Sequence, residues 1–208
     1  GQSTEALTEF YAGIALMFHV TSAVTGMLVG IVLMMSIGYD MLRSRIAETE
    51  VDPLTKLGNR RRLDRLIADD EEAGGTRIGA VMVIDLDHFK KINDLFGHDA
   101  GDVVLQRVGA RLTSLLGPFG EVCRTGGEEF VALIDQDFAA GTSALALAVR
   151  EAIAELTFEA RLARATVTAS VGFHRRTEGI EVKEAIRRAD QAVYCAKADG
   201  RNRVVAAT

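Results

Sequence analysis

Residues 78–94 read IGAVMVIDLDHFKKIND, an apolar run that passes directly into acidic and basic side chains. The apolar part, Ile78–Ile84, is rich in β-branched residues, which predicts a buried strand. Asp85 and Asp87 come at its end, and side chains two apart on a strand share a face. Such a carboxylate pair suits Mg²⁺, and the lysines from Lys90 onward suit a triphosphate. A strand end with solvated charges is the alternative when this segment is taken alone.

Two further clusters carry charges of the same kinds. RTGGEEF (124–130) is a glycine hairpin with Glu128 and Glu129 at its tip. Because successive strand residues face opposite ways, one acid is expected to face a metal and the other substrate or solvent. In AKADGRNRV (196–204), Lys197 and Arg201 are four apart and on one helical face would clamp phosphates. A solvated turn and a surface charge pair are the alternatives, but one polyphosphate site accounts for all three clusters.

The pattern of the remaining chain predicts a largely antiparallel sheet with helices packed against it. Gly126-Gly127 favours a tight hairpin, and Gly200 is a stop signal for the last helix. The expected elements after the first strand are a helix at Ala100–Leu116, a hairpin of Glu121–Arg124 and Phe130–Ile134, a helix at Ala144–Leu156, a strand at Thr166–Phe173, a helix at Val182–Ala198 and a last strand at Val204-Val205.

The N-terminal part is different in character. No Asp, Glu, Lys or Arg occurs from Phe10 to Tyr39. A bilayer needs about 20 apolar helical residues, so this run predicts a transmembrane helix; a buried helix of an N-terminal bundle is the alternative. Basic residues from Arg43 onward follow the run and acidic residues precede it, which places the C-terminal part in the cytoplasm, at the inner membrane. Asp52-Pro53 marks a domain boundary near residue 50.

Composition excludes several classes of protein. The net charge of -5 and a pI near 5.4 argue against a broad nucleic-acid surface, so no nucleic-acid partner is expected. Cys123 and Cys195 are far apart and have no second cysteine or histidine at metal-ligand spacing, so neither a disulfide framework nor a zinc site is expected. Both cysteines are interpreted as small core residues.

Four blocks, in this order, resemble the signature blocks of GGDEF diguanylate cyclases: DPLTKLGNRRRLD (52–64), DLDHFKKINDLFGHDAGD (85–102), RTGGEEF and AKADGRNRV. The resemblance implies an α+β fold of the nucleotidyl-cyclase type, related to the ferredoxin-like fold, with a central five-stranded, mostly antiparallel sheet and surrounding helices. We therefore expect a transmembrane helix and helical stalk in residues 1–50 and a GGDEF domain in residues 51–208.

The resemblance also implies roles for the acidic residues. Asp85, the backbone carbonyl of Leu86 and Glu128 would hold Mg²⁺, or Mn²⁺ in its place. Glu128 would also help to activate a ribose 3′-hydroxyl, and Glu129 is the second acid of the catalytic motif. Catalysis is thus expected to rest on Asp85, Glu128 and Glu129.

Substrate contacts follow from the same resemblance. Asn93 and Asp102 match positions that read the guanine edge, although capping of the neighbouring turn and helix is the structural alternative. The matching phosphate contacts are the side chains of Lys90, Lys197 and Arg201 and the backbone amides of His88 and Phe89.

The implied activity is that of a diguanylate cyclase, which joins two GTP into cyclic di-GMP and releases two pyrophosphates. Each chain of a homodimer would present one GTP, so the stalks and membrane helices would control activity by orienting the two chains. A non-catalytic GTP-binding or scaffolding domain is the main alternative. Another nucleotidyl cyclase that acts on one ATP or GTP is a third interpretation, which the guanine-reading pair disfavours.

The sequence departs from the family at one site. Many members carry an RxxD product-inhibition motif whose Asp lies four residues before the Arg of RxGG(D/E)EF. Here those two places hold Gly117 and Gly120, which have no side chain to bind guanine or phosphate. We therefore expect no feedback inhibition through that site.

Overall fold

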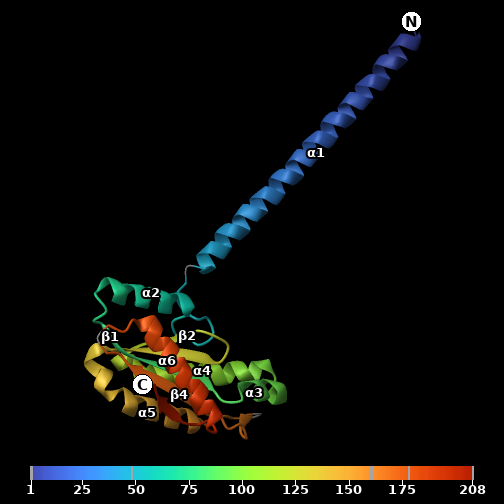
Figure 1. The fold of residues 1–208 in the computed structure, drawn as a ribbon. Helices are drawn as coiled ribbons and strands as arrows, with labels where there is room; N and C mark the ends of the chain where they lie inside the picture. The colour runs from blue at the N-terminus through green and yellow to red at the C-terminus, as the bar shows by residue number, and fades with distance from the viewer. Residues whose placement is uncertain (1, 48, 160–161, 178, 208) are drawn as a thin grey trace. The chain divides into compact units, whose positions relative to one another are not determined.

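The computed structural model describes residues 2–47, 49–159, 162–177 and 179–207. The chain divides near residue 50 into two compact units. The first consists of helix α1 (Gln2–Ala47), and the second contains the sheet and all other helices (Figure 1).

Helix α1 contains Leu16–Gly38, a span long and apolar enough to cross a membrane, and none of it is buried. Neighbouring positions such as Val32, Leu33, Met34 and Met35 are all exposed, so the helix is apolar on every side. A coiled-coil helix would instead show one apolar stripe and a polar remainder. The predicted apolar N-terminal helix is therefore present.

The second unit is built on a five-stranded sheet with the order β2-β3-β1-β4-β5. All neighbours are antiparallel except β4 and β5, which are parallel, so the predicted mostly antiparallel sheet is confirmed. The strands are β1 (Ile78–Leu86), β2 (Gly120–Arg124), β3 (Glu129–Asp135), β4 (Ala169–Arg175) and β5 (Val204–Ala206).

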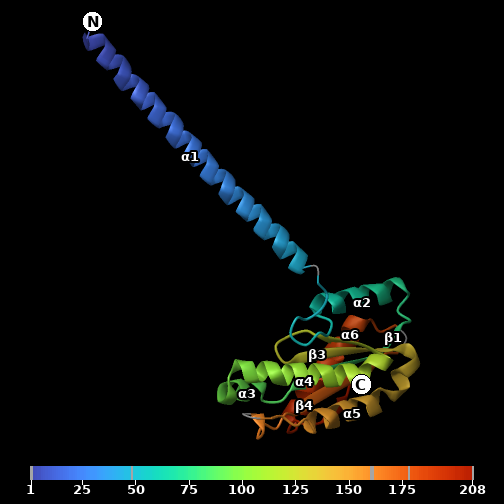
Figure 2. The same cartoon turned by 180° about the vertical axis from the view of Figure 1, so that it is seen from behind.

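Helices cover both faces of this sheet: α6 lies in front of the sheet in Figure 1, and α4 lies in front of it in the reverse view of Figure 2. In β1, Met82 and Ile84 join the core that includes α4 and α5, whereas Val81 and Val83 join the core under α2 and α6. The helices are α2 (Arg60–Glu72), α3 (Phe89–Phe96), α4 (His98–Leu116), α5 (Thr142–Ala154) and α6 (Val182–Ala198), with 3₁₀ turns η1 (Gly117–Phe119) and η2 (Gln136–Gly141).

A buried ion pair fixes the far end of the sheet. The Asp70 carboxylate, at the end of α2, accepts hydrogen bonds from the backbone of Arg77 and Ile78, each at 2.9 Å. The Arg176 guanidinium donates to the same carboxylate at 2.9 Å. Because Asp70 is only 1% exposed, these partners hold α2, β1 and the end of β4 together.

The structure differs from the sequence-based expectation in element boundaries and in two additional helices. The strand expected at Thr166–Phe173 is β4, which begins at Ala169 and ends at Arg175. Helices α2 and α3 did not emerge from hydrophobic spacing alone. The start of α2 does carry a local signal, because the Asn59 side chain accepts from the amides of Arg61 and Arg62.

Candidate active site

The ends of several elements meet around Asp85, near the end of β1. In the sheet register, Asp85 lies opposite Glu129 of β3 on one side and Ser170 of β4 on the other. Alternation along the strands places Asp85 and Glu129 on the face that α2 and α6 cover. From the last turn of α6, the Lys197 ammonium nitrogen approaches Asp85 Oδ2 to 2.8 Å. Three of the predicted charged clusters are thus in one place.

Asp85 has the character of a cation ligand. Its Oδ1 is buried and has no hydrogen-bond partner in the described part of the chain, while Oδ2 already faces the positive charge of Lys197. Buried carboxylate oxygens are normally paired, so an orphaned one next to a cation indicates a group that completes the site.

Glu129 adds negative charge to this region. Burial raises the pKa of its carboxyl above the ordinary value, and the nearby charges of Asp190 and Asp85 raise it further. The positive charges of Arg60 and Lys197 act in the opposite direction. A bound cation would relieve this repulsion between acids.

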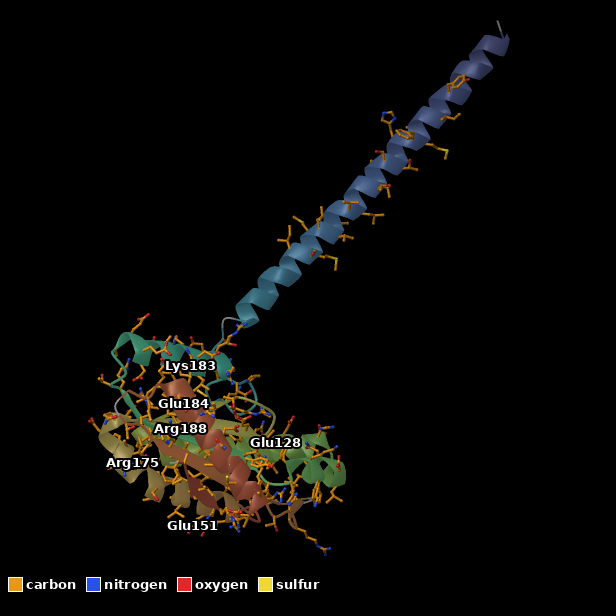
Figure 3. The ribbon with its side chains drawn as sticks, viewed as in Figure 1. Glu128, Glu151, Arg175, Lys183, Glu184 and Arg188 are labelled. Atoms are coloured by element: carbon orange, nitrogen blue, oxygen red, sulfur yellow. The ribbon has the colours of Figure 1, made fainter. Side chains whose placement is uncertain are left out.

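Glu128 lies in the turn before β3 and is labelled in Figure 3. Its carbonyl oxygen accepts a hydrogen bond from the amide of Leu86 at 3.2 Å, which ties the hairpin tip to the end of β1. The register thus brings Glu129, rather than the Glu128 side chain, directly opposite Asp85. Which acid binds the metal stays a prediction.

These residues fit a magnesium ion that is shared with a phosphate substrate. Within the described residues, no three His, Cys, Asp or Glu side chains are placed to hold a metal. Mg²⁺ commonly takes one or two protein carboxylates and completes its shell with water and substrate phosphates. Asp85, its orphaned oxygen and the neighbouring carbonyl of Leu86 match that kind of site.

Asp87 has a different role from the one that its spacing suggested. β1 ends at Leu86, and the Asp87 carboxylate accepts from the hydroxyls of Thr168 and Ser170 at 2.8 and 2.7 Å and from the amide of Asn202 at 3.0 Å. Its side chain is therefore occupied by the protein itself. The expectation that both aspartates face one cation was wrong for Asp87.

The predicted phosphate contacts next to β1 lie at the start of α3. His88 precedes this helix in a left-handed conformation with φ of 56°, Phe89 is its first residue, and Lys90 is exposed. Amides in the first turn of a helix have no partner within the helix and attract anions. This arrangement is compatible with the predicted phosphate contacts.

The predicted guanine readers lie on α3 and α4. Asn93 Oδ1 is buried and has no hydrogen-bond partner in the described chain. This amide lies against Gly101, where any side chain would collide with it. Asp102 is exposed in the first turns of α4. An unpartnered amide oxygen and an exposed carboxylate are both suited to the donors on the guanine edge, so the reading of guanine by Asn93 and Asp102 stays a prediction.

Arg201 is not on a helical face with Lys197. Helix α6 ends at Ala198, as predicted, and Arg201 and Asn202 follow in left-handed conformations with φ of 64° and 44°. The Arg201 amide donates to the carbonyl of Ala196 at 2.9 Å. The spacing argument was therefore wrong, because the turn rather than the helix presents Arg201.

The sequence analysis did not identify Arg124 as a positioning residue. The Arg124 guanidinium donates to the Gly127 carbonyl through Nε and Nη2, at 3.2 and 2.7 Å, and so fixes the hairpin turn. Its Nη1 pairs with the Asp52 carboxylate at 3.2 Å. The hairpin is thus coupled to the first turn of the domain. The two residues are 72 positions apart, so only their presence in adjoining motifs hinted at the contact.

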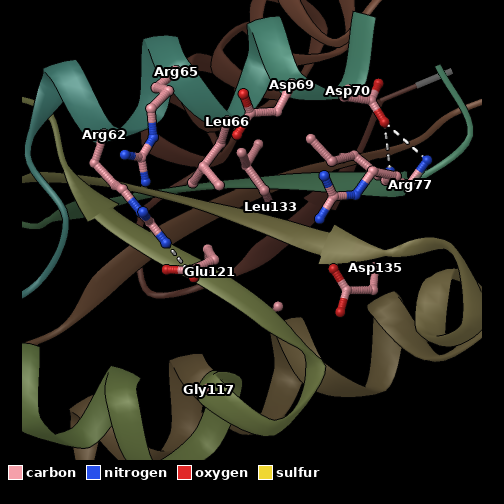
Figure 4. A pocket seen from close by; sticks show the side chains of 12 residues that line it. Arg62, Arg65, Leu66, Asp69, Asp70, Arg77, Gly117, Glu121, Leu133 and Asp135 are labelled. Atoms are coloured by element: carbon pink, nitrogen blue, oxygen red, sulfur yellow. Dashed lines mark hydrogen bonds and ion pairs between the residues drawn. The ribbon is translucent and has the colours of Figure 1, made fainter. Parts of the chain in front are cut away.

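A pocket of about 370 Å³ lies between α2 and the β2–β3 edge and contains none of the predicted site residues (Figure 4). It is lined by Gly117 and Gly120, where the RxxD motif would stand. A side chain at Gly120 would collide with the backbone of Leu133. Arg62 Nη2 in this pocket already pairs with Glu121 at 2.8 Å. Arg65 and Arg77 also line the pocket, so whether it binds product stays a prediction.

The two cysteines differ in environment. Cys123 is buried beneath Gly58, and burial raises the pKa of its thiol to about 12. Cys195 is exposed on α6, so the interpretation of both as core residues was wrong for Cys195. The apolar periodicity of a helix does not by itself show whether a small residue such as cysteine faces the core or the solvent.

Comparison with known proteins shows the family to which the chain belongs. The family model "Diguanylate cyclase, GGDEF domain" matches residues 49–203. Response regulator PleD of Caulobacter vibrioides is 40% identical over 161 residues, which cover 74% of this chain and 35% of PleD. Diguanylate cyclase DgcP of Pseudomonas aeruginosa is 41% identical over 158 residues, which cover 74% of this chain and 23% of DgcP. The chain thus spans about a third or less of these relatives.

Solved structures show the same fold. The coiled coil and GGDEF domain of DgcB from Caulobacter crescentus, in complex with c-di-GMP, superposes with a TM-score of 0.68 at 31% identity, over 86% of this chain and 99% of that one. The active GGEEF domain of a diguanylate cyclase from Vibrio cholerae gives a TM-score of 0.65 at 31% identity, over 73% and 98%. The chain therefore belongs to the GGDEF family of diguanylate cyclases.

Proposed function

We propose that this chain condenses two GTP molecules into cyclic di-GMP and two pyrophosphates. The observation that carries the proposal is the meeting of the motifs around Asp85: Glu129 lies opposite it in register, and Lys197 contacts it from α6. This meeting supports the proposal, because phosphoryl transfer needs a metal ligand, a phosphate-binding cation and a base close together.

In this site Asp85, the Leu86 carbonyl and Glu128 hold Mg²⁺ or Mn²⁺, which neutralises charge on the phosphates when it is bound. Lys90, Lys197 and Arg201, with the amides of His88 and Phe89, bind the triphosphate. Asn93 and Asp102 read the guanine. These contacts fix the GTP so that its ribose 3′-oxygen and its α-phosphorus are available to a second molecule.

Each chain supplies half of the reaction. The 3′-oxygen of each GTP attacks the α-phosphorus of the other, the hydroxyl proton passes to Glu128 or Glu129, and pyrophosphate leaves. Two such steps close the ring, so two chains must face each other. We propose a homodimer as the active form, with α1 holding the chains in the inner membrane and the GGDEF domain in the cytoplasm. The exposed apolar span Leu16–Gly38 supports this anchor.

Dimer-dependent turnover tests this proposal. Pyrophosphate release is measured with GTP and Mg²⁺ over a range of concentrations of the 208-residue chain in detergent, with ATP as the alternative substrate. We expect release with GTP only, at a rate per chain that rises with protein concentration and then saturates. The control Asp85→Asn should abolish release. GTP binding without release at any concentration, even after chemical cross-linking of dimers, would favour the scaffolding interpretation.

The glycines at the RxxD positions support a second part of the proposal. Gly117 and Gly120 offer no side chain, and the backbone of Leu133 blocks one at Gly120. We propose that product does not inhibit the enzyme through this surface. Tight binding of cyclic di-GMP to the pocket shown in Figure 4, detected by chemical-shift changes there, would contradict it.

A further inference from the structure

Lys197 occupies a place that suits a metal ion. Its ammonium nitrogen lies 2.8 Å from Asp85 Oδ2, while Asp85 Oδ1 is buried without a hydrogen-bond partner in the described chain. The Asp85 side chain is 18% exposed and that of Lys197 is 35% exposed. The carboxylate is therefore held in the site, whereas the lysine has access to solvent and freedom to take another partner.

The acidic surroundings of Asp85 favour a positive charge beside it. Glu129 lies opposite Asp85. Burial raises the pKa of the Glu129 carboxyl, the charges of Asp190 and Asp85 raise it further, and the charge of Lys197 acts in the opposite direction. Without Lys197 or a metal, these acids would repel one another across two strands and a helix. A single positive charge, either ammonium or metal, relieves that repulsion.

We propose that Lys197 is a place-holder that changes partner when substrate binds. In the nucleotide-free chain its ammonium pairs with Asp85, and when metal and GTP enter, the metal takes Asp85 and Lys197 moves to the phosphates. This inference rests on the proposed function, which assigns Asp85 to the metal and Lys197 to phosphate.

The exchange has a thermodynamic consequence. A metal that arrives alone must displace the ammonium and gives it no new acceptor, so its binding is weakened. A metal that arrives with GTP brings phosphate oxygens that accept the lysine. Metal and nucleotide therefore help each other to bind through Lys197, in addition to their direct contact, and this coupling is reciprocal. The site therefore binds metal more weakly until a nucleotide is present.

Opposite effects of one substitution test the exchange. Mn²⁺ binding to the nucleotide-free 208-residue chain is measured from the electron paramagnetic resonance signal of free Mn²⁺, and binding of a non-hydrolysable GTP analogue is measured with Mn²⁺ present. Lys197→Met should tighten Mn²⁺ binding about fivefold without nucleotide, the factor expected for a partly exposed ion pair. The same variant should weaken analogue binding by a similar factor.

Lys90→Met is the matched control, because Lys90 is also assigned to phosphate, is exposed and is not the residue paired with Asp85. It should weaken analogue binding and leave nucleotide-free Mn²⁺ binding within about twofold of the wild type, as expected for an exposed, solvent-screened charge that does not pair with Asp85. An equal gain in Mn²⁺ affinity in this variant would reduce the effect to general electrostatics and overturn the exchange.

Asp85→Asn distinguishes failure of the proposed metal site from failure of the proposed Lys197 exchange. If it weakens nucleotide-free Mn²⁺ binding but Lys197→Met fails to tighten it, the metal site stands and the exchange is refuted. If Asp85→Asn leaves Mn²⁺ binding unchanged, the assignment of Asp85 to the metal fails, and the exchange fails with it.

Discussion

Removal of the Asp87 carboxylate should destabilise the domain by an amount that its hydrogen bonds predict. Asp87 is 4% exposed and accepts from Thr168, Ser170 and the backbone of Asn202. At about 1 kcal/mol net for each bond, Asp87→Ala should cost about 3 kcal/mol. For a domain of this size that is a fall in Tm of about 9 °C. Urea unfolding of the nucleotide-free chain, followed by circular dichroism, measures the loss, with an unchanged m-value.

Two companion variants make the test specific. Asp94→Ala removes an exposed carboxylate from α3 and should change stability by no more than about 0.5 kcal/mol. In a Ser170→Ala background, Asp87→Ala should cost about 1 kcal/mol less than in the wild type, because one of its partners is already gone. A cost of Asp87→Ala no larger than that of Asp94→Ala would refute a structural role for Asp87.

Three further outcomes follow from the surroundings of individual side chains. Asp70→Asn should lower stability by about 3 kcal/mol, because Arg176 stays nearly buried without its counter-charge; a thermal shift within error of the wild type would contradict this. The pKa of Glu129 is higher in the folded chain than in the unfolded chain, so ionisation of Glu129 destabilises the fold. This destabilisation is absent below the pKa of the unfolded chain and is complete once the pH has risen through the pKa of the folded chain. Glu129→Gln should therefore raise the Tm at about pH 7 and lose that gain at about pH 4, and an equal effect at both pH values would refute the assignment. At neutral pH a thiol reagent should modify Cys195 but not Cys123, whose pKa burial raises to about 12; labelling of the native Cys195→Ser variant would contradict the burial of Cys123.

The parts of the fold that the sequence predicted are those governed by local signals. Gly126-Gly127 indicates the hairpin, and the spacing of apolar residues up to Ala198 with Gly200 beyond it gives the end of α6. The strand β1 follows from an uninterrupted apolar run. Helix α3 was missed because it has eight residues and starts at a left-handed His88, which no hydrophobic period signals.

The features that could not be predicted from the sequence depend on contacts between segments that are distant along the chain. Asp85 and Asp87 are equivalent by spacing, but Thr168, Ser170 and Asn202 take Asp87, and these partners are more than 80 residues away. The pairing of Arg124 with Asp52 is likewise a tertiary contact without a local pattern.

Product identity tests the central claim most directly. The 208-residue chain is incubated with GTP and Mg²⁺, and the products are separated by chromatography and identified by mass spectrometry, with Glu128→Ala in parallel. The account predicts cyclic di-GMP and one pyrophosphate for each GTP consumed, and neither product from the variant. Recovery of unchanged GTP, of a cyclic mononucleotide, or of cyclic di-GMP at the same rate from Glu128→Ala would contradict it.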